Sequence, residues 1–117
     1  MNYRSDFDLD LSTGEQGEAL VHDMLHLSTI EVKTDFMANV TGNIAVEFES
    51  WGKPSGIAVT KARHWVFVIP NKIAIFVETN RLKSIARHFY QMGRIAPGGD
   101  LNKSKMVLIP ITELIHG

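Results

Sequence analysis

The chain has 117 residues, of which 44% are hydrophobic and 21% are charged, and this composition is typical of one soluble globular domain. It has no cysteine, which excludes disulfides, thiolate metal sites and cysteine nucleophiles and suits a reducing, cytoplasmic compartment. No apolar run approaches the ~20 residues of a membrane span, and the first residues, MNYRSDFDLD, are too acidic for a signal peptide. We therefore expect a cytoplasmic domain in which oxygen or histidine ligands would hold any metal.

The net charge of −1 conceals an asymmetry between the two halves of the chain. Residues 1–50 contain ten acids and two bases, a net charge of −8, whereas residues 51–117 contain ten bases and three acids, a net charge of +7. Such asymmetry is a hint of nucleic-acid contact. Two solvated faces of opposite charge explain it equally well, so charge alone leaves both interpretations open.

The N-terminal segment predicts an arm followed by a helix. Residues 1–11 contain the alternating stretch SDFDLDL, which is typical of an edge strand or of an arm that reaches a partner subunit. Ser12 and Glu15 have the spacing of a helix capping box, which predicts a helix over 13–26. We expect a single domain over 12–117.

Two strands are predicted next, and they carry a dense set of ionisable residues. Residues 28–35 are rich in β-branched side chains, residues 43–50 alternate, and a hairpin is the most economical way to pair them. One side of these strands would carry Glu31, Lys33 and Asp35, then Asn43, Ala45, Glu47 and Glu49. In a hairpin, Asp35 and Glu47 would come within reach of one metal ion. Glu18 lies at the edge of the preceding helix's apolar stripe and is expected to face inward.

The second half of the chain predicts alternating short strands and helices. The expected elements are a helical turn at 60–64, strands at 65–69 and 73–78, a helix from a Thr79 cap to Met92, a strand at 105–109 and a short final helix. The solvent face of the longer helix is basic. The order of elements predicts a mixed α/β or α+β domain, in which a central sheet is flanked by helices.

The order of the acidic residues resembles that of a known nuclease superfamily. Glu18 in a helix, Asp35 at a strand end and Glu47-Phe48-Glu49 inside an apolar strand are similar to the PD-(D/E)XK superfamily, which includes restriction endonucleases and Holliday-junction resolvases. The stretches EVKTD, TGNIAVEFES and GKPSGIAVTKARHWVFV also resemble small phage-encoded members, and the similarity covers most of the chain. The resemblance implies a restriction-endonuclease-like core and a Mg²⁺- or Mn²⁺-dependent DNA endonuclease, located in the host cytoplasm if phage-encoded.

The resemblance also implies a role for each acidic position. Asp35 and Glu47 would be metal ligands together with the backbone carbonyl of Phe48, and Glu18 would hold a metal-bound water. Such a set suits Mg²⁺, because this ion prefers hard oxygen ligands and takes only one or two protein carboxylates. The ion would neutralise charge on the scissile phosphate and activate the attacking water.

The sequence departs from the superfamily pattern at the third position of the tripeptide, where Glu49 stands instead of lysine. Some restriction enzymes of the superfamily have Glu-x-Glu there. Lys33, on the same strand face as Asp35, is a second source of the missing ammonium, and either Glu49 or Lys33 would orient the attacking water. A different register takes Glu31 to Lys33 as the tripeptide, with Asp23 as the upstream acid.

The basic residues of the second half are candidates for contacts with phosphates. The candidate nucleic-acid-binding residues are Lys53, Ser55, Lys61, Arg63, Arg81, Lys83, Arg87 and Arg94. A domain this small offers little surface to a duplex, which favours a homodimer. The alternative function is a DNA-binding or assembly module that keeps the fold without the chemistry, and Glu49 in the lysine position favours it. An RNase also stays open, because no residue reports on a 2′-hydroxyl.

Overall fold

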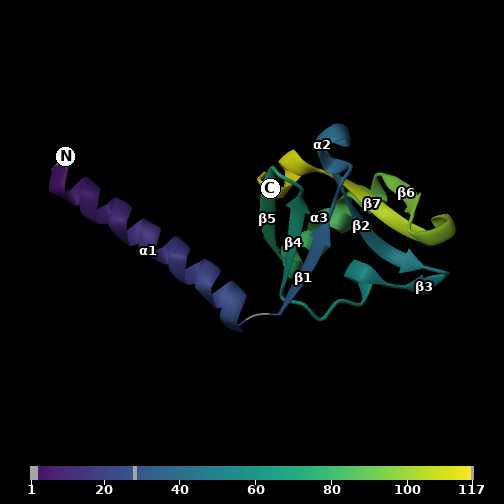
Figure 1. Cartoon of the computed structure of the whole chain (residues 1–117), viewed down its shortest axis with the longest axis horizontal. Coiled ribbons are helices and arrows are strands. Elements are labelled where there is room, and N and C mark those ends of the chain that lie inside the picture. Colours follow the sequence, from purple (N-terminus) through teal and green to yellow (C-terminus); the bar gives the residue numbers. More distant parts are fainter. Residues whose placement is uncertain (1–2, 28, 117) are drawn as a thin grey trace.

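The computed structural model describes residues 3–27 and 29–116, which form two small sheets, the helices around them and a projecting N-terminal helix (Figure 1). The first sheet has the order β1-β4-β5, with strands Ile30–Thr34, His64–Ile69 and Ile73–Glu78. The second has the order β3-β2-β7-β6, with strands Lys53–Pro54, Asn43–Ser50, Ser104–Pro110 and Ile95–Gly98. The α-helices are α1 (Tyr3–Leu27), α2 (Ala38–Thr41) and α3 (Thr79–Gln91), and 3₁₀ turns span Gly56–Ala58 (η1), Asp100–Asn102 (η2) and Ile111–Leu114 (η3). The chain is therefore an α+β protein with one mixed and one antiparallel sheet.

The predicted hairpin between the first two strands is wrong, because β1 and β2 belong to different sheets. β1 runs parallel to β4, whereas β2 pairs antiparallel with β7 along nearly its whole length. In the β2–β7 ladder, Ile44 is opposite Ile109 and Val46 is opposite Val107, and all four side chains are buried. Burial of these four apolar side chains favours β7 as the partner of β2.

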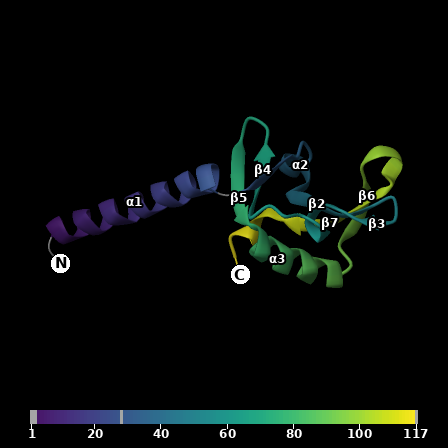
Figure 2. The ribbon, with the colours of Figure 1, turned by 90° about the horizontal axis from the view of Figure 1, so that it is seen from below.

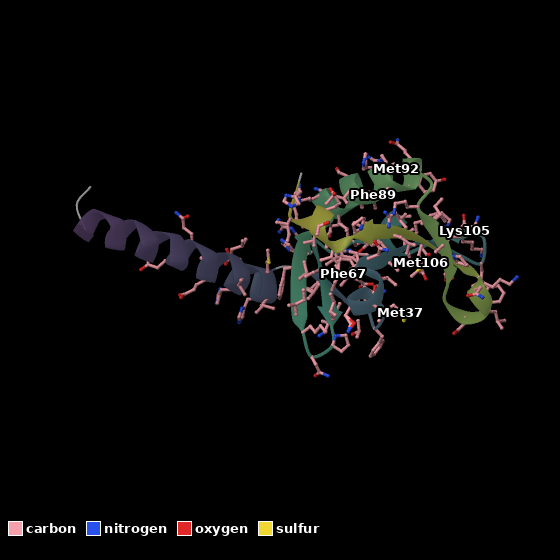
Figure 3. The ribbon with its side chains drawn as sticks, turned by 90° about the horizontal axis from the view of Figure 1, so that it is seen from above. Met37, Phe67, Phe89, Met92, Lys105 and Met106 are labelled. Carbon is pink, nitrogen blue, oxygen red and sulfur yellow. The ribbon has the colours of Figure 1, made fainter. Side chains whose placement is uncertain are left out.

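The core lies between the sheets and α3. Its largest fully buried side chains come from separate elements: Trp65 and Phe67 on β4, Leu82 on α3, Ile44 on β2 and Ile109 on β7. Figure 3 shows Phe67 and Phe89 pointing into this interior from the sheet and from α3. Burial of each such side chain contributes about 1.5–3 kcal/mol. The core thus joins both sheets through the amphipathic helix that the sequence predicts.

The N-terminal segment is one helix and not an arm followed by a helix. α1 continues from Tyr3 to Leu27, so the predicted edge strand over 5–11 and the helix start at Ser12 are wrong. Apolar residues in this stretch also recur every four positions, a spacing that fits a helix as well as their alternation fits a strand. Acidic residues near the start of a helix stabilise its N-terminus. α1 extends away from the sheets (Figures 1 and 2), and Glu18 is exposed on it, which corrects the expected inward orientation.

Most predictions for the second half are confirmed, including the strand at 105–109, which is β7, and two are corrected. The β4–β5 hairpin and the long helix have nearly the predicted bounds, and Gly93 ends that helix with a φ of 78°. The predicted helical turn at 60–64 is absent, and a 3₁₀ turn lies earlier, at η1. Thr79 is the first residue of the helix and Glu78 is its cap, and the Thr79 Oγ1 donates a hydrogen bond of 2.7 Å to the carbonyl of Ala62. In the part of the chain that the structure describes, no helix is long and apolar enough to cross a membrane.

Gly56 predicts a sharp stability effect. It has a φ of +53°, and a Cβ added there would lie 2.2 Å from the carbonyl oxygen of Glu47. We expect Gly56→Ala to lower the free energy of unfolding by about 3 kcal/mol, since left-handed strain adds to the clash. Gly42→Ala is the matched control, because Gly42 has a φ of +73° with nothing within 4 Å. This control should lose only about 1 kcal/mol in urea denaturation, and equal losses would contradict the close approach.

Candidate functional site

Asp35 connects the two sheets through its carboxylate. Its backbone N–H extends the β1 ladder by donating to the carbonyl of Val68 at 2.9 Å. Its Oδ1 accepts hydrogen bonds from the backbone N–H groups of Met37 (3.0 Å) and Ala38 (2.9 Å), at the start of α2. Its Oδ2 accepts a hydrogen bond of 3.1 Å from the backbone N–H of Ala45 on β2. The Asp35 carboxylate therefore lies beside β2, although β1 and β2 do not pair.

Glu47 lies on β2, two residues after Ala45, whose backbone N–H Asp35 binds. Ala45 and Glu47 project to the same side of the strand, and their Cα atoms are about 6.6 Å apart at the usual strand rise. Glu47 is half-buried, with Gly56 packed against its backbone. Among residues 3–27 and 29–116, its carboxylate has no ion pair or hydrogen bond. Glu47 is thus a half-buried acid that has no counter-charge within the described residues, and it lies on the strand that Asp35 contacts.

Phe48 and Glu49 occupy a β-bulge, and their surroundings differ from those expected. The Phe48 carbonyl accepts a hydrogen bond of 3.0 Å from the backbone N–H of Ser55, which leaves one of its lone pairs for another ligand. The Glu49 carboxylate forms a salt bridge of 3.2 Å with Lys105 on β7. A bulge redirects the side chains that follow it, which explains why Glu49 approaches β7. Lys105 was not among the predicted site residues, since only the β2–β7 pairing brings it there.

Lys33 and Glu31 share the inner side of β1 with Asp35. Both are half-buried, whereas Val32 between them is 60% exposed, so the charged side of β1 and not its apolar side faces the molecule. The Lys33 ammonium lies 3.2 Å from a carboxylate oxygen of Glu31 and 5.7 Å from the ring centroid of the buried Trp65. This contact with the ring gives a physical reason for the inward orientation. Lys33 is therefore the cation on the Asp35 side of the strand.

The predicted acids do not all come together. Within the described ranges, no three His, Cys, Asp or Glu side chains form a group that could hold a metal ion. Glu18 lies on the projecting α1, and Glu49 pairs with Lys105. What remains are two carboxylates at β2: Asp35, which contacts Ala45, and Glu47, whose backbone packs against Gly56. The Ser55 hydroxyl is buried and has no hydrogen-bond partner in the described part of the chain.

The predicted phosphate-binding residues fall into two groups. Lys61, Arg63 and Lys83 line one polar pocket beside the start of α3, and Lys61 also lines a neighbouring pocket with Glu31. The others do not line that pocket. Arg87 lines a different pocket that it shares with Lys83, and Lys53 is exposed on β3. Arg81 donates to the carbonyl of His116 at 3.0 Å, and Arg94 donates to Asn43 Oδ1 at 3.0 Å. The first group therefore lies at the N-terminal end of β1, where the Arg63 N–H donates to the carbonyl of Thr29, and Asp35 lies at the other end of the strand.

No family model, curated protein or solved structure matches the chain. The resemblance to the PD-(D/E)XK superfamily and the restriction-endonuclease-like core therefore stay predictions. The function has to be inferred from the residues and their geometry.

The network around Asp35 predicts a large effect on stability. Asp35→Ala leaves three backbone N–H groups without their acceptor, and we expect it to lower the free energy of unfolding by about 2–3 kcal/mol. Asp35→Asn should lose less, since its amide oxygen can still accept from two of them. Glu47→Ala should lose less than about 1 kcal/mol, because its carboxylate has no partner to leave behind. Urea denaturation followed by circular dichroism measures all three, and a larger loss in Glu47→Ala than in Asp35→Ala would contradict this assignment.

Proposed function

We propose that this chain is a metal-dependent phosphodiesterase that cleaves nucleic acid, with Asp35 and Glu47 as its acidic pair. The observation that carries the proposal is the hydrogen bond of 3.1 Å from the Ala45 N–H to Asp35 Oδ2. This bond brings the Asp35 carboxylate to β2 at Ala45, two residues along that strand from Glu47. Two carboxylates that approach each other without a cation repel, so a divalent ion bound between Asp35 and Glu47 would stabilise them.

The oxygen donors around this pair fit Mg²⁺ or Mn²⁺. A carboxylate has about four lone-pair directions, and backbone amides occupy three of those of Asp35, leaving one on Oδ2. Glu47 is unpaired among the described residues, and the buried Ser55 hydroxyl next to Gly56 lacks a partner within them. Mg²⁺ takes one or two carboxylates and keeps several waters, so it needs no third acid.

The chain's own residues would have distinct tasks in cleavage. A bound divalent ion supplies charge neutralisation and an activated water. Asp35 is held by its three amides, so it can position a ligand without reorganisation. Lys33 is the cation that would orient the attacking water or stabilise charge on the phosphate. Lys61, Arg63 and Lys83, at the opposite end of β1 from Asp35, would hold phosphates further along the strand.

DNA is the substrate that we propose, with a homodimer as the acting form. On α1, Leu20, Val21 and Leu25 are 56%, 45% and 55% exposed, and apolar side chains in such a stripe favour contact with another chain. A second copy would also enlarge the small surface that one domain offers to a duplex.

One set of contacts favours a non-enzymatic DNA-binding or assembly module instead. The bonds of Asp35 to backbone amides already account for this residue structurally, and Lys105 neutralises Glu49. In such a module, the fold would be retained and the acidic pair would bind no ion. Cleavage and ion binding separate the two functions.

The decisive experiment measures cleavage of linear duplex, single-stranded and four-way-junction DNA, and of RNA, in Mg²⁺ or Mn²⁺. We expect cleavage that Glu47→Gln slows by at least about 100-fold, the usual effect of losing an electrostatic contact to the transition state. Glu49→Gln is the matched control on the same strand, and its rate should stay within a few-fold of the unaltered protein, because Glu49 faces Lys105.

Ion binding gives an independent readout. Mn²⁺ at about 100 times its Kd should stabilise the unaltered protein by about 2.7 kcal/mol, and Glu47→Gln should lose this gain. Binding of DNA without cleavage and without any shift in melting temperature would reject the enzyme and support the module. Loss of cleavage in Glu49→Gln, with Glu47→Gln unaffected, would reject the assignment of the acidic pair.

A further inference from the structure

The turn between β2 and β3 holds a tryptophan in an unusual conformation. Trp51 and Gly52 have φ values of 51° and 76°, the combination that two-residue hairpin turns normally fill with Asn-Gly. A bulky side chain at positive φ is a genuine outlier, and such strain is concentrated at functional sites. The Trp51 side chain is 60% exposed. Burial of this side chain therefore does not account for the strained backbone.

The neighbouring loop holds this tryptophan in place. The Trp51 N–H donates a hydrogen bond of 2.9 Å to the carbonyl of Lys103, and the Lys103 ammonium lies 5.7 Å from the centroid of the indole ring. The Ser104 hydroxyl donates to the Ser50 hydroxyl at 3.1 Å, which joins the same two segments. Lys103 thus covers the ring from one direction, while the exposed remainder of the ring is open to a planar ligand.

Lysines outnumber acids around this ring. Lys53 lies on β3, and Lys103 and Lys105 line one open pocket together with Trp51. Of the two acids in these segments, Glu49 pairs with Lys105, and Asp100 lies in η2. More cations than anions thus surround the ring. Proteins that bind single-stranded nucleic acid combine positive charge for the backbone with aromatic rings for the bases in this way.

The position of the turn agrees with the proposed acidic pair. Trp51 follows Glu47 by four residues, which corresponds to about 13 Å along an extended strand. That distance is about four steps of a stacked nucleic-acid strand at ~3.4 Å per step. The turn lies at the end of the molecule opposite α1, where Figure 3 also shows Lys105.

We infer that Trp51 is a stacking platform for an unpaired base, and that Lys53 and Lys103 contact the phosphates beside it. This inference rests on the proposed action on nucleic acid, and it narrows the ligand to single-stranded or locally unpaired strands. A base inside a duplex is stacked on both faces, so it offers none to a protein ring without leaving the stack. Continuous duplex would therefore gain little from Trp51.

The test is binding of a labelled single-stranded oligonucleotide and of the matching duplex, by fluorescence anisotropy in EDTA. We expect Trp51→Asn to weaken single-strand binding by about tenfold, the range of one base–aromatic stack, and to leave duplex binding within twofold. Asn suits the positive φ, so this variant should melt at a higher temperature, which separates lost stacking from lost folding. Trp51→Phe should restore most of the binding. Lys103→Gln should reduce the slope of log affinity against log salt by about 0.7.

The outcomes separate this inference from the proposed activity. Because EDTA removes divalent ions, single-strand binding that depends on Trp51 would support the inference even if no cleavage is ever detected. Equal single-strand affinity of the unaltered protein and Trp51→Asn would overturn it, even if Glu47-dependent cleavage is present. Equal weakening of single-strand and duplex binding in Trp51→Asn would also overturn it, because stacking on an unpaired base predicts a selective loss.

Discussion

The contact on which the site depends is the Asp35 carboxylate with its three backbone donors. Asp35 follows β1, and its carboxylate accepts hydrogen bonds at the start of α2 and at Ala45 on β2. One side chain thus connects the two sheets outside their hydrogen-bonded ladders. Backbone N–H groups that lose such an acceptor are costly in a partly buried position. The same bonds hold the Asp35 carboxylate oxygens in place at β2. Structural anchoring and chemical positioning are therefore compatible at this residue, and the proposed activity requires both.

The pairing of the strands separates the charged residues around Asp35 and Glu47 into two groups. Glu49, next to the pair in sequence, is turned by the bulge toward Lys105 on β7, whereas Lys33 on β1 remains on the side of Asp35. A lysine beside the acids is what the resemblance to PD-(D/E)XK nucleases implies, and this fold offers it from the preceding strand. In the proposed activity, Lys33 would act on the attacking water, whereas Glu49 is paired with Lys105.

Strained backbone collects at the end of the molecule that carries the β2–β3 turn. Trp51, Leu101 and Asn102 all have φ values between 50° and 60°, and Leu101 is 79% exposed. Strain of this kind persists where surrounding bonds over-determine it, as the bond from Trp51 to Lys103 does here. The opposite end carries the projecting α1. A substrate strand and a second copy of the chain would therefore use different ends of the molecule.

The sequence alone determined most local structure: β2, the β4–β5 hairpin and α3 follow from periodicity and turn residues, which depend on near neighbours. It did not determine the strand partners. The sequence of β1 and β2 is compatible with a hairpin between them, and only the apolar face of β7 excludes that pairing. β6 was missed because Pro97 and two glycines indicate a loop, and only its pairing with β7 makes it a strand. The acids could be named from their spacing, but the inward side of β1, the isolation of Glu18 and the Glu49–Lys105 bridge depend on contacts between distant residues. Such contacts are set by burial of the whole core, which no local pattern encodes.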